Sequence, residues 1–333
     1  MTKDIVTVYD VADRAGVSQS TVSRVLAGGA RVSEERRQAV LRAIDELGYR
    51  PNVAAQGLAR GHSHVIGILA RNVTNPYYGQ IIQGVELGLR GSGYRPLIAC
   101  AEATDNPAAA VDVLADSRVD ALILVGGPLP ADPILELASD TPLAAIGPVI
   151  AGLESHYIAS DNRQGGKIAA QHLADLGHKR IAHIMGPVAY PYANDRLVGF
   201  REGLSALGLD LPDAWIRSGA FAEKSGYSAM RDLWEKGLRP TAVFAASDQL
   251  AYGAMLALYE LGVNVPRDVS IIGFDDQIHA PYTIPPLTTI RQPTVEMGTA
   301  LARMVLGDLQ GQPWRPNPFP TELVVRASTV AAV

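Results

Sequence analysis

The sequence predicts an α/β protein in two parts, a small all-α module over residues 1–61 and a large module over 63–333 with parallel, doubly wound sheets in two lobes. Three observations support this. Apolar residues at helical spacing fill the N-terminal part, strands alternate with helices from His64 onward, and charge is unevenly divided. Residues 1–62 carry nine Lys or Arg and seven Asp or Glu, whereas the other 271 carry 20 and 27. This asymmetry indicates a small polyanion-binding module on a larger acidic body.

Composition narrows the class of protein. With 333 residues, 47% hydrophobic and 19% charged, the chain is long and apolar enough to fill the cores of two or three globular domains. We expect no membrane span and no secretory signal, because no apolar run approaches the required length of about 20 residues and the N-terminus is acidic. The single cysteine, Cys100, excludes an intramolecular disulfide and a cysteine-based zinc site. A cytoplasmic protein is therefore expected.

Three short helices are predicted in the N-terminal module. The first has apolar residues spaced by three and four, at Val8, Val11, Ala12 and Ala15. It ends at Gly16, Ser18 can cap the second helix, Ser33 is expected to cap the third, and Gly48 stands where a left-handed terminating glycine belongs. Two short helices joined by a tight turn and followed by a third form a helix-turn-helix layout.

In a helix-turn-helix module the second helix enters the major groove of DNA and its N-terminal residues face the base edges. The polar side chains at this place are Gln19, Ser20, Thr21, Ser23 and Arg24. Glutamine can pair with adenine, arginine with guanine, and hydroxyls with phosphates or bases. A polar face on a short helix also fits a merely solvated surface, so the pattern alone leaves both readings open.

Four runs carry a resemblance to a known family: Tyr9-Asp10-Val11-Ala12, Ala15-Gly16-Val17-Ser18, Thr21-Val22-Ser23-Arg24 and Leu47-Gly48-Tyr49-Arg50-Pro51-Asn52. Through them, residues 7–61 resemble the DNA-binding headpiece of the LacI/GalR repressor family. The resemblance implies that Gln19, Ser20 and Arg24 contact bases. It implies a DNA-binding set that also includes Ser18, Thr21, Ser23 and Asn52.

Residues 53–60 are similar to the hinge helix of that family. The resemblance implies that two such helices from a dimer lie in the minor groove and that Leu58, followed by Ala59, wedges into the central base step. An apolar wedge of this kind exchanges unstacking energy for a bent duplex with more contacts. Core packing is the alternative role for a lone leucine in a linker.

The large module alternates between strands and helices. The expected strands are Val65–Leu69, Pro96–Ala99, Ala121–Val125, Leu143–Ile146, Ile181–Met185, Ala242–Ala246 and Val269–Phe274. The expected helices include one with Tyr78, Ile81, Val85 and Leu89 on one face, and others near Gly165–Leu176, Leu197–Leu207 and Asp248–Leu261. Strands that are apolar throughout predict parallel sheets covered on both faces. A ligand is expected in the crevice at the carboxyl ends of the strands.

Further runs extend the resemblance over the large module: Asn75-Pro76-Tyr77-Tyr78, Asp161-Asn162, Arg196-Leu197-Val198-Gly199-Phe200, Ser247-Asp248 and Gly273-Phe274-Asp275-Asp276. This module resembles the core of the same family, and that of periplasmic sugar-binding proteins. The resemblance implies an N-lobe of residues 63–162 and 293–322 and a C-lobe of residues 163–290 and 323–333. Three crossings between the lobes would form a hinge that closes on a ligand.

The resemblance also implies five effector-binding residues: Tyr77, Arg196, Phe221, Ser247 and Asp275. Arg196 would reach oxygens of the ligand with its fork of donors, and Asp275 would accept hydrogen bonds from hydroxyl groups. Phe221 would stack on an apolar face of the ligand. A surface ion pair is the alternative role for Arg196 and Asp275.

An enzyme is not expected. The chain lacks a phosphate-binding loop, a dinucleotide fingerprint and a nucleophile elbow, and its histidines are not at metal-ligand spacing, so no catalytic residue, cofactor or metal is predicted. We interpret the sequence as a repressor that binds double-stranded operator DNA as a homodimer under control of a small sugar-like effector. A sugar, sugar acid, polyol or nucleoside fits the expected Arg, Asp and aromatic residues, and the resemblance also allows a purine. The alternative is a sugar-binding transport receptor, which is disfavoured because it requires export and has no headpiece.

Overall fold

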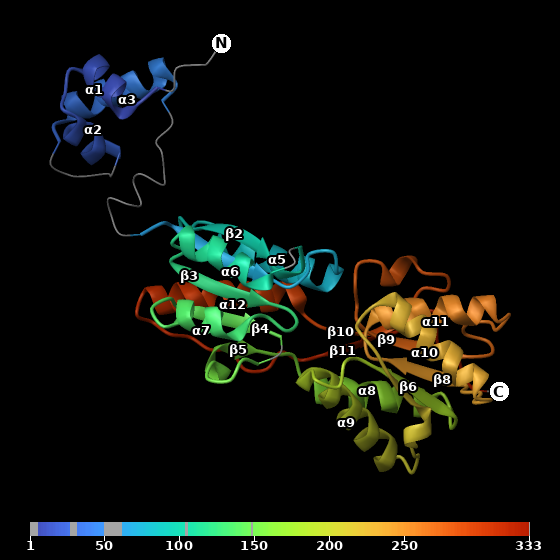
Figure 1. Ribbon diagram of the computed structural model, residues 1–333. Helices are drawn as coiled ribbons and strands as arrows, with labels where there is room; N and C mark the ends of the chain where they lie inside the picture. Colours follow the sequence, from blue (N-terminus) through green and yellow to red (C-terminus); the bar gives the residue numbers. More distant parts are fainter. Residues whose placement is uncertain (1–5, 27–31, 50–61, 104–105, 148, 333) are drawn as a thin grey trace. The chain divides into compact units, whose positions relative to one another are not determined.

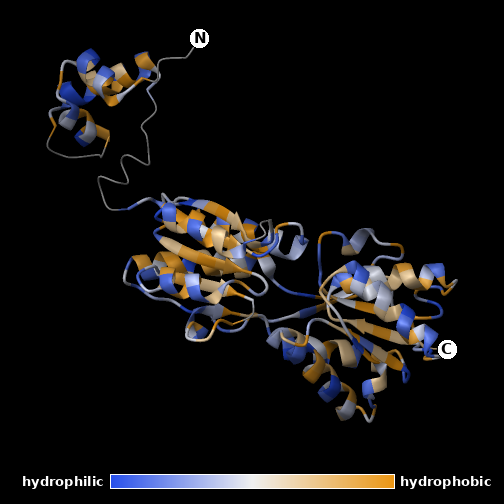
Figure 2. Cartoon of the chain, viewed as in Figure 1, coloured by the Kyte–Doolittle hydropathy of each residue, from blue (hydrophilic) through white to orange (hydrophobic). Residues whose placement is uncertain are grey.

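The computed structural model of the protein describes residues 6–26, 32–49, 62–103, 106–147 and 149–332 (Figure 1). The chain forms two compact units, residues 1–63 and 64–333. Each unit has its own buried apolar core. Figure 2 shows that hydrophobic residues concentrate on the strands of the large unit, as expected for strands covered on both faces.

The small unit contains three helices: α1 (Val8–Ala15), α2 (Gln19–Leu26) and α3 (Glu34–Leu47). Thr7 opens α1 with a capping box, in which the Thr7 backbone N–H donates to Asp10 Oδ2 at 2.7 Å and the Thr7 hydroxyl accepts from the Asp10 N–H. The three helices bury a common set of side chains, namely Val11, Ala12, Val22, Val25, Val40 and Ala43. The predicted all-α helix-turn-helix module is confirmed.

The ends of these helices test the local predictions. Gly16 (φ 62°) and Gly48 (φ 61°) both adopt the left-handed conformation that ends a helix, as expected. Ser18 Oγ accepts a hydrogen bond from the Thr21 N–H at 3.3 Å, which is the capping contact predicted for α2. The prediction for Ser33 is wrong in one respect, because Ser33 stands at the N-cap position of α3 but its side chain makes no capping hydrogen bond.

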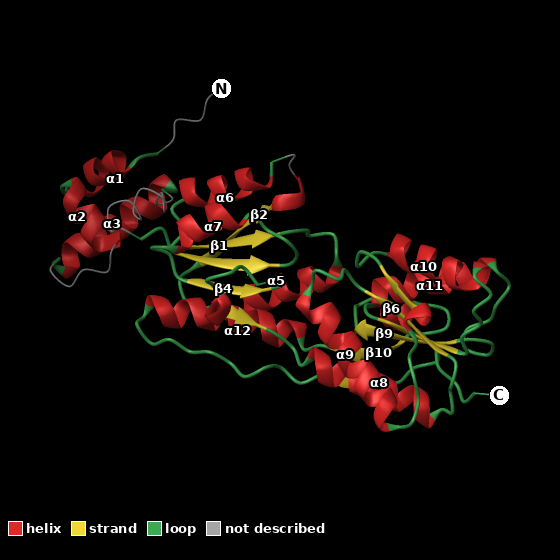
Figure 3. Ribbon diagram, turned by 60° about the horizontal axis from the view of Figure 1, so that its bottom comes forward, coloured by secondary structure: helices red, strands yellow, loops and turns green. Residues whose placement is uncertain are grey.

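The N-lobe is built on a five-stranded parallel sheet in the order β2-β1-β3-β4-β5. The strands are β1 (Val65–Ala70), β2 (Arg95–Cys100), β3 (Ala121–Val125), β4 (Leu143–Ile146) and β5 (Tyr157–Ile158). One face is covered by α5 (Pro76–Leu89) and α12 (Thr294–Leu309), and the other by α6 (Pro107–Asp116) and α7 (Ala131–Ala138). Figure 3 shows the strands between these two helical layers.

The C-lobe is built on a six-stranded sheet in the order β11-β10-β9-β8-β6-β7. The strands are β6 (Ile181–Met185), β7 (Ile216–Ser218), β8 (Ala242–Ala245), β9 (Ser270–Asp275), β10 (Thr288–Arg291) and β11 (Glu322–Val324). The helices that cover one face are α8 (Asn162–Asp175) and α9 (Pro191–Ala206), and those on the other are α10 (Glu223–Glu235) and α11 (Asp248–Glu260). Only β11 pairs antiparallel to its neighbour among the described strands. The predicted α/β class with parallel, doubly wound sheets in two lobes is confirmed.

The chain passes between the two sheets three times. It leaves the N-lobe after β5, returns from β10 to α12, and enters the C-lobe again from α12 to β11. Helix α8 begins at Asn162 and β11 begins at Glu322, each one residue earlier than the lobe boundaries implied by the resemblance. The reasons are local, because the Asp161 side chain caps α8 and Glu322 pairs with Arg291 across the sheet. The crossings bring the residues between β5 and α8 next to those after β10.

Candidate functional site

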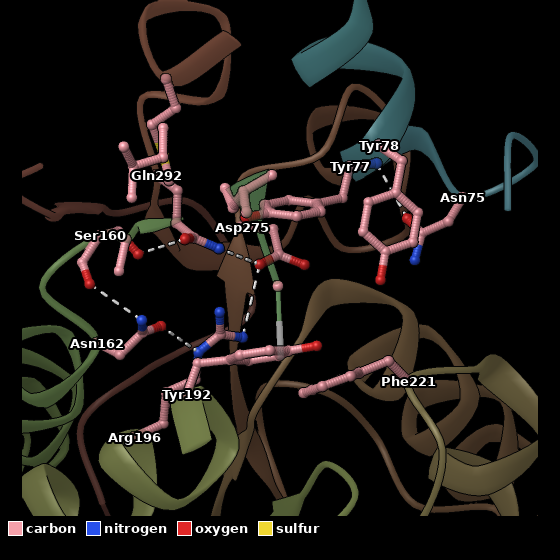
Figure 4. Close-up of a pocket in the computed structure, with 15 residues that line it drawn as sticks. Asn75, Tyr77, Tyr78, Ser160, Asn162, Tyr192, Arg196, Phe221, Asp275 and Gln292 are labelled. Carbon is pink, nitrogen blue, oxygen red and sulfur yellow. Dashed lines mark hydrogen bonds and ion pairs between the residues drawn. The ribbon is translucent and has the colours of Figure 1, made fainter. Parts of the chain in front are cut away.

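A cavity of about 60 Å³ lies at the carboxyl ends of the strands, with walls from both lobes. Figure 4 shows the side chains that line it. The apolar part consists of Ile146, Gly147, Ile158, Ala159 and Met297, and the aromatic part of Tyr77, Tyr78, Tyr192 and Phe221. The polar part consists of Asn75, Ser160, Asn162, Arg196, Asp275 and Gln292. A concave site with apolar walls and a few converging polar groups is typical of small-molecule recognition.

Arg196 supplies the positive charge of the cavity. It belongs to α9, is 4% exposed, and lies above the ring of Phe274, with its guanidinium carbon 3.7 Å from the ring centroid. Its Nε donates to Asn162 Oδ1 at 2.8 Å, and its Nη1 donates to the backbone oxygen of Ala246. These contacts hold the guanidinium in one orientation at the wall of the cavity.

Asp275 supplies the negative charge. It is the last residue of β9 and is 6% exposed. Its Oδ1 accepts from Gln292 Nε2 at 2.6 Å, and its Oδ2 accepts from Gln277 Nε2 at 3.3 Å. Burial raises the pKa of Asp275 to about 6, against the opposing effects of Arg196 and of these hydrogen bonds. The carboxylate is therefore an acceptor whose ionisation changes close to neutral pH.

A polar chain continues from Asp275 along the wall of the cavity. Gln292 accepts a hydrogen bond from the Ser160 hydroxyl, and Asn162 Nδ2 donates to the backbone oxygen of Ser160 at 3.0 Å. Asn162 in turn accepts from Arg196. These contacts form a continuous ring of donors and acceptors, made by Arg196, Asn162, Ser160, Gln292 and Asp275 (Figure 4). Such a ring can exchange hydrogen bonds with a ligand that carries both hydroxyl donors and acceptors.

Aromatic rings form the facing wall. Tyr192 and Phe221 stack with centroids 5.8 Å apart and planes inclined by 15°. Tyr77 and Tyr78, from the first turn of α5, pack edge to face at 5.4 Å. Burial raises the pKa of Tyr78 to about 12 and that of Tyr77 further, so both phenols stay neutral. This wall offers apolar contact and no additional charge.

A direct contact joins the lobes at the edge of the cavity. Asn75 caps α5 by accepting from the Tyr77 N–H at 3.0 Å, and its Nδ2 donates to Gln249 Oε1 of α11 at 2.7 Å. Gln249 Nε2 also contacts Glu223 Oε1 at 3.2 Å. One hydrogen-bonded chain therefore runs from the N-terminus of α5 to the N-termini of α11 and α10.

Of the five effector residues expected from the resemblance, the structure brings four together, namely Tyr77, Arg196, Phe221 and Asp275. Ser247 is not among the residues that line the cavity. Its side chain is buried and caps α11, accepting from the Leu250 N–H at 3.3 Å. A serine directly before a helix commonly has this capping role.

Several lining residues were not predicted as site residues, namely Asn75, Tyr78, Ser160, Asn162, Tyr192 and Gln292. The runs around Asn75 and Asn162 were recognised, but only as family signatures. Asn162 and Gln292 both follow a strand closely, and polar residues after parallel strands are the available signal. Ser160, two residues after β5, carries the same signal, whereas Tyr192 carries none.

Some of the residues expected to contact DNA lie on the exposed face of α2, and others lie outside the described residues. Gln19, Ser20, Ser23 and Arg24 are exposed, while Val22 and Val25 point into the core. Ser18 Oγ lies 2.9 Å from the hydroxyls of both Ser20 and Thr21, which orders the start of the helix. Asn52, Leu58, Ala59 and the expected hinge helix 53–60 lie outside the described residues.

Metal-ligand clusters and membrane-spanning helices are both missing from the described ranges. Nowhere in them do three or more His, Cys, Asp or Glu side chains gather as a metal ion would require. None of the helices described is long and apolar enough to cross a membrane.

Comparison with known proteins places this geometry in a family. The model of the bacterial regulatory proteins of the lacI family matches residues 7–52, and that of the periplasmic binding protein-like domain matches residues 170–329. The ribose operon repressor of Escherichia coli (strain K12) is 37% identical over 295 residues, which cover 88% of this chain and 89% of that protein. The HTH-type transcriptional repressor PurR of Klebsiella pneumoniae subsp. pneumoniae is 36% identical over 305 residues, 90% of this chain and 89% of that protein.

Solved structures of similar regulators support the same family. The crystal structure of the lac repressor dimer bound to operator and the anti-inducer ONPF has a TM-score of 0.86 and 32% identity, covering 98% of this chain and 99% of that one. The transcriptional regulator CelR in complex with cellobiose has a TM-score of 0.72 and 34% identity, covering 97% and 99%. The match over residues 7–52 decides against a transport receptor. The chain belongs to the LacI family of bacterial regulatory proteins and is a DNA-binding repressor of transcription.

Proposed function

We propose that the repressor binds operator DNA as a homodimer and that a small polyhydroxylated ligand, a monosaccharide or a close derivative, controls this binding from the cavity between the lobes. The observation that carries the proposal is the pairing of Arg196 with Asp275 inside a ring of polar side chains opposite an aromatic wall. Solved relatives support it, since one is a dimer bound to operator and another is a complex with cellobiose.

The chemistry of the cavity favours a neutral, hydroxyl-rich ligand. Arg196 and Asp275 carry opposite charges, and they are the charged residues among those that line the cavity. A sugar hydroxyl can donate to Asp275 and accept from Arg196 or Gln292, while its C–H face packs on Phe221 and Tyr192. The name of one relative, the ribose operon repressor, supports a monosaccharide. A purine base, which can also stack on Phe221, is the competing ligand class.

For the operator, we propose that Gln19, Ser20 and Arg24 contact base edges in the major groove. The residues that fix the register of the headpiece on the DNA are Ser18, Thr21, Ser23 and Asn52. Leu58 and Ala59 enter the minor groove. Two headpieces of a dimer would read a near-palindromic site. We further propose that the chain is not an enzyme, uses no cofactor, and acts in the cytoplasm, where its operator lies. The relatives named above are repressors, which supports this.

The experiment that tests the proposal has two stages. A thermal-shift screen of the purified protein covers pentoses, hexoses, cellobiose and purine bases, because a ligand raises stability by about 2.7 kcal/mol at a hundredfold excess over its Kd. Operator titrations with and without each stabilising compound follow, by fluorescence anisotropy. A monosaccharide that stabilises the protein and changes operator affinity supports the proposal. Stabilisation by a purine base alone, or by no compound, contradicts it.

Arg196→Gln links this response to the cavity. We expect it to bind operator like the wild type but to lose the response, because a charge-assisted hydrogen bond to a buried ligand contributes about 1.5–3 kcal/mol. Arg163→Gln, which removes an exposed arginine paired with Glu202, is the matched control and should respond normally. An unchanged response of Arg196→Gln at the wild-type ligand concentration would exclude Arg196 from the effector site.

A further inference from the structure

The turn that follows β9 has an unusual backbone. Asp275 has a φ of 116° and Asp276 a φ of 55°, so two consecutive residues with side chains adopt the region that favours glycine. Residues in such conformations persist only where their surroundings hold them, and they gather at ligand sites. Asp275 lines the effector cavity, so the contacts that hold this turn bear on the site.

Asp276 makes two of these contacts. Its carboxylate is 8% exposed and bridges two guanidinium groups, with Oδ1 2.6 Å from Arg326 Nη2 and Oδ2 2.7 Å from Arg291 Nε. Arg326 is itself held, since its Nη1 donates to the backbone oxygen of Leu287 at 2.8 Å. Asp276 does not line the effector cavity. It lines a second cavity of about 490 Å³ together with Arg291, and Gln292 lines both cavities.

The turn is also held on its other side. The Gln277 N–H donates to Oδ2 of the fully buried Asp248 at 2.7 Å, and Asp248 Oδ1 accepts from the Thr289 hydroxyl at 2.6 Å. The backbone of residues 275–277 is thus fastened at Asp276 by two arginines and at Gln277 by a carboxylate. Asp275 lies next to both attachments, and its carboxylate lines the cavity.

The arginines that hold Asp276 lie where the chain crosses between the lobes. Arg291 is the last residue of β10, just before the crossing to α12, and it also pairs at 2.7 Å with Glu322, the first residue of β11 after the return crossing. The orientation of Asp275 is therefore tied to the hinge as well as to the sheet.

We propose that Asp276 is a positioning residue for effector binding: its ion pairs with Arg326 and Arg291 hold the left-handed turn that points the Asp275 carboxylate at Arg196 and Gln292. The inference rests on the proposed function, because it takes Asp275 to contact the effector. A purely structural role for Asp276 would change stability and leave effector affinity unaltered.

The test uses the full-length chain and two isosteric variants. Asp276→Asn removes the charge but keeps a residue that tolerates a positive φ. Glu322→Gln is the matched control, because it removes the other carboxylate on Arg291 without touching the turn. Isothermal titration with D-ribose and, in parallel, with adenine measures affinity. We expect Asp276→Asn to weaken binding of the ligand that the wild type accepts by at least about tenfold, and Glu322→Gln to match the wild type.

Two variants of Arg326 keep the proposal testable if Asp276→Asn does not fold. Arg326→Gln should weaken binding as Asp276→Asn does, while Arg326→Lys, which keeps the charge opposite Asp276, should restore most of it. Operator affinity without ligand should remain at the wild-type value in every folded variant. Wild-type effector affinity in Asp276→Asn or in Arg326→Gln, even with lowered thermal stability, would overturn the proposal.

Crystal structures of the unliganded wild type and Asp276→Asn provide a readout that needs no ligand. We expect residue 275 of the variant to leave the left-handed region and its carboxylate to lose the hydrogen bond from Gln292. A variant that keeps both features would overturn the inference. If the wild type binds neither probe, the ligand class under the proposed function is what fails, and this structural comparison still decides the role of Asp276.

Discussion

Arg196 Nη1 lies 3.6 Å from Asp275 Oδ1, and the two side chains are 5% and 7% exposed. A buried pair of this kind gives little net stability, because each charge loses its hydration, but breaking it leaves one charge uncompensated. The pair joins α9 to the end of β9, and the aromatic rings of Phe274, Tyr192 and Phe221 surround the guanidinium. Both residues line the cavity, where we propose above that they bind the effector.

The first prediction concerns the stability of this pair. We expect Arg196→Ala to lower the free energy of unfolding by about 3–5 kcal/mol, because Asp275 is left buried and unpaired. The double variant Arg196→Ala/Asp275→Asn should lose clearly less than the sum of the single losses, since no charge remains. Urea unfolding of the four proteins measures this coupling. Arg163→Ala, at an exposed pair, should cost about 1 kcal/mol or less. Additive losses in the cycle would contradict the prediction.

The second prediction concerns pH. Since burial raises the pKa of Asp275 to about 6, a ligand that donates hydroxyl hydrogens to the ionised carboxylate should bind about tenfold more weakly at pH 5 than at pH 7.5. Gln277 and Gln292 donate hydrogen bonds to Asp275, and the titratable groups near it include Arg196, the buried Asp248 and Tyr77. Isothermal titration across this range tests the trend.

Asp275→Asn is the control for the pH profile, and we expect its weaker affinity to be flat between these values. Stability changes in the opposite sense. The folded state binds the Asp275 proton more tightly than the unfolded state, so this group favours folding below about pH 4 and this contribution is lost as the pH rises to about 6. A wild-type affinity that does not change with pH would show that the ligand does not use the ionised carboxylate.

The third prediction concerns Leu58, which lies outside the described residues and is expected to wedge into the operator. Leu58→Ala should weaken binding to the specific site by on the order of 1–2 kcal/mol, because the wedge acts on base stacking. Binding to random DNA, which depends on phosphate contacts and salt, should stay nearly unchanged. Fluorescence anisotropy at two salt concentrations compares the two. An equal loss on both kinds of DNA would mean that Leu58 is only structural.

The fourth prediction concerns the contact between α8 and α9, the helices that carry Asn162 and Arg196. A Cβ atom at Gly199 would lie 1.9 Å from the backbone oxygen of Arg163, so the helices touch through this glycine. Gly199→Ala should therefore lower the free energy of unfolding by about 1–3 kcal/mol. Gly79→Ala, in α5, meets no atom within 4 Å and should raise it by about 0.5–1 kcal/mol. Similar effects at both sites, in urea unfolding, would refute this account of the packing.

The sequence predicted most of the sheet framework. Three expected strands agree with β3, β4 and β6 to the residue, namely Ala121–Val125, Leu143–Ile146 and Ile181–Met185. Their ends could be predicted because each is an apolar run with turn residues on both sides. The short strands β5 and β7 were not expected, since segments of two or three residues contain no detectable period. Helices α6, α7, α10 and α12 also went without a specific prediction.

Family motifs allowed Arg196 and Asp275 to be recognised as partners in one site, but not the residues that complete it. Ser160 and Gln292 are separated by 132 residues and are hydrogen-bonded because two crossings between the lobes run side by side. Asp276 was known only as the neighbour of Asp275, and its role depends on Arg291 and Arg326.

The sequence by itself determined the two-part organisation, the helix-turn-helix module, the α/β class and the membership of a repressor family. These properties follow from periodicities and motifs a few residues long, which depend on local geometry. Only the tertiary structure decided that Ser247 caps α11, that Asn162 and Gln292 line the same cavity as Arg196 and Asp275, and that Arg291 and Arg326 pair with Asp276. The reason is physical: hydrogen bonds and ion pairs form between groups that are close in space, and three crossings of the chain bring together residues that are far apart in the sequence.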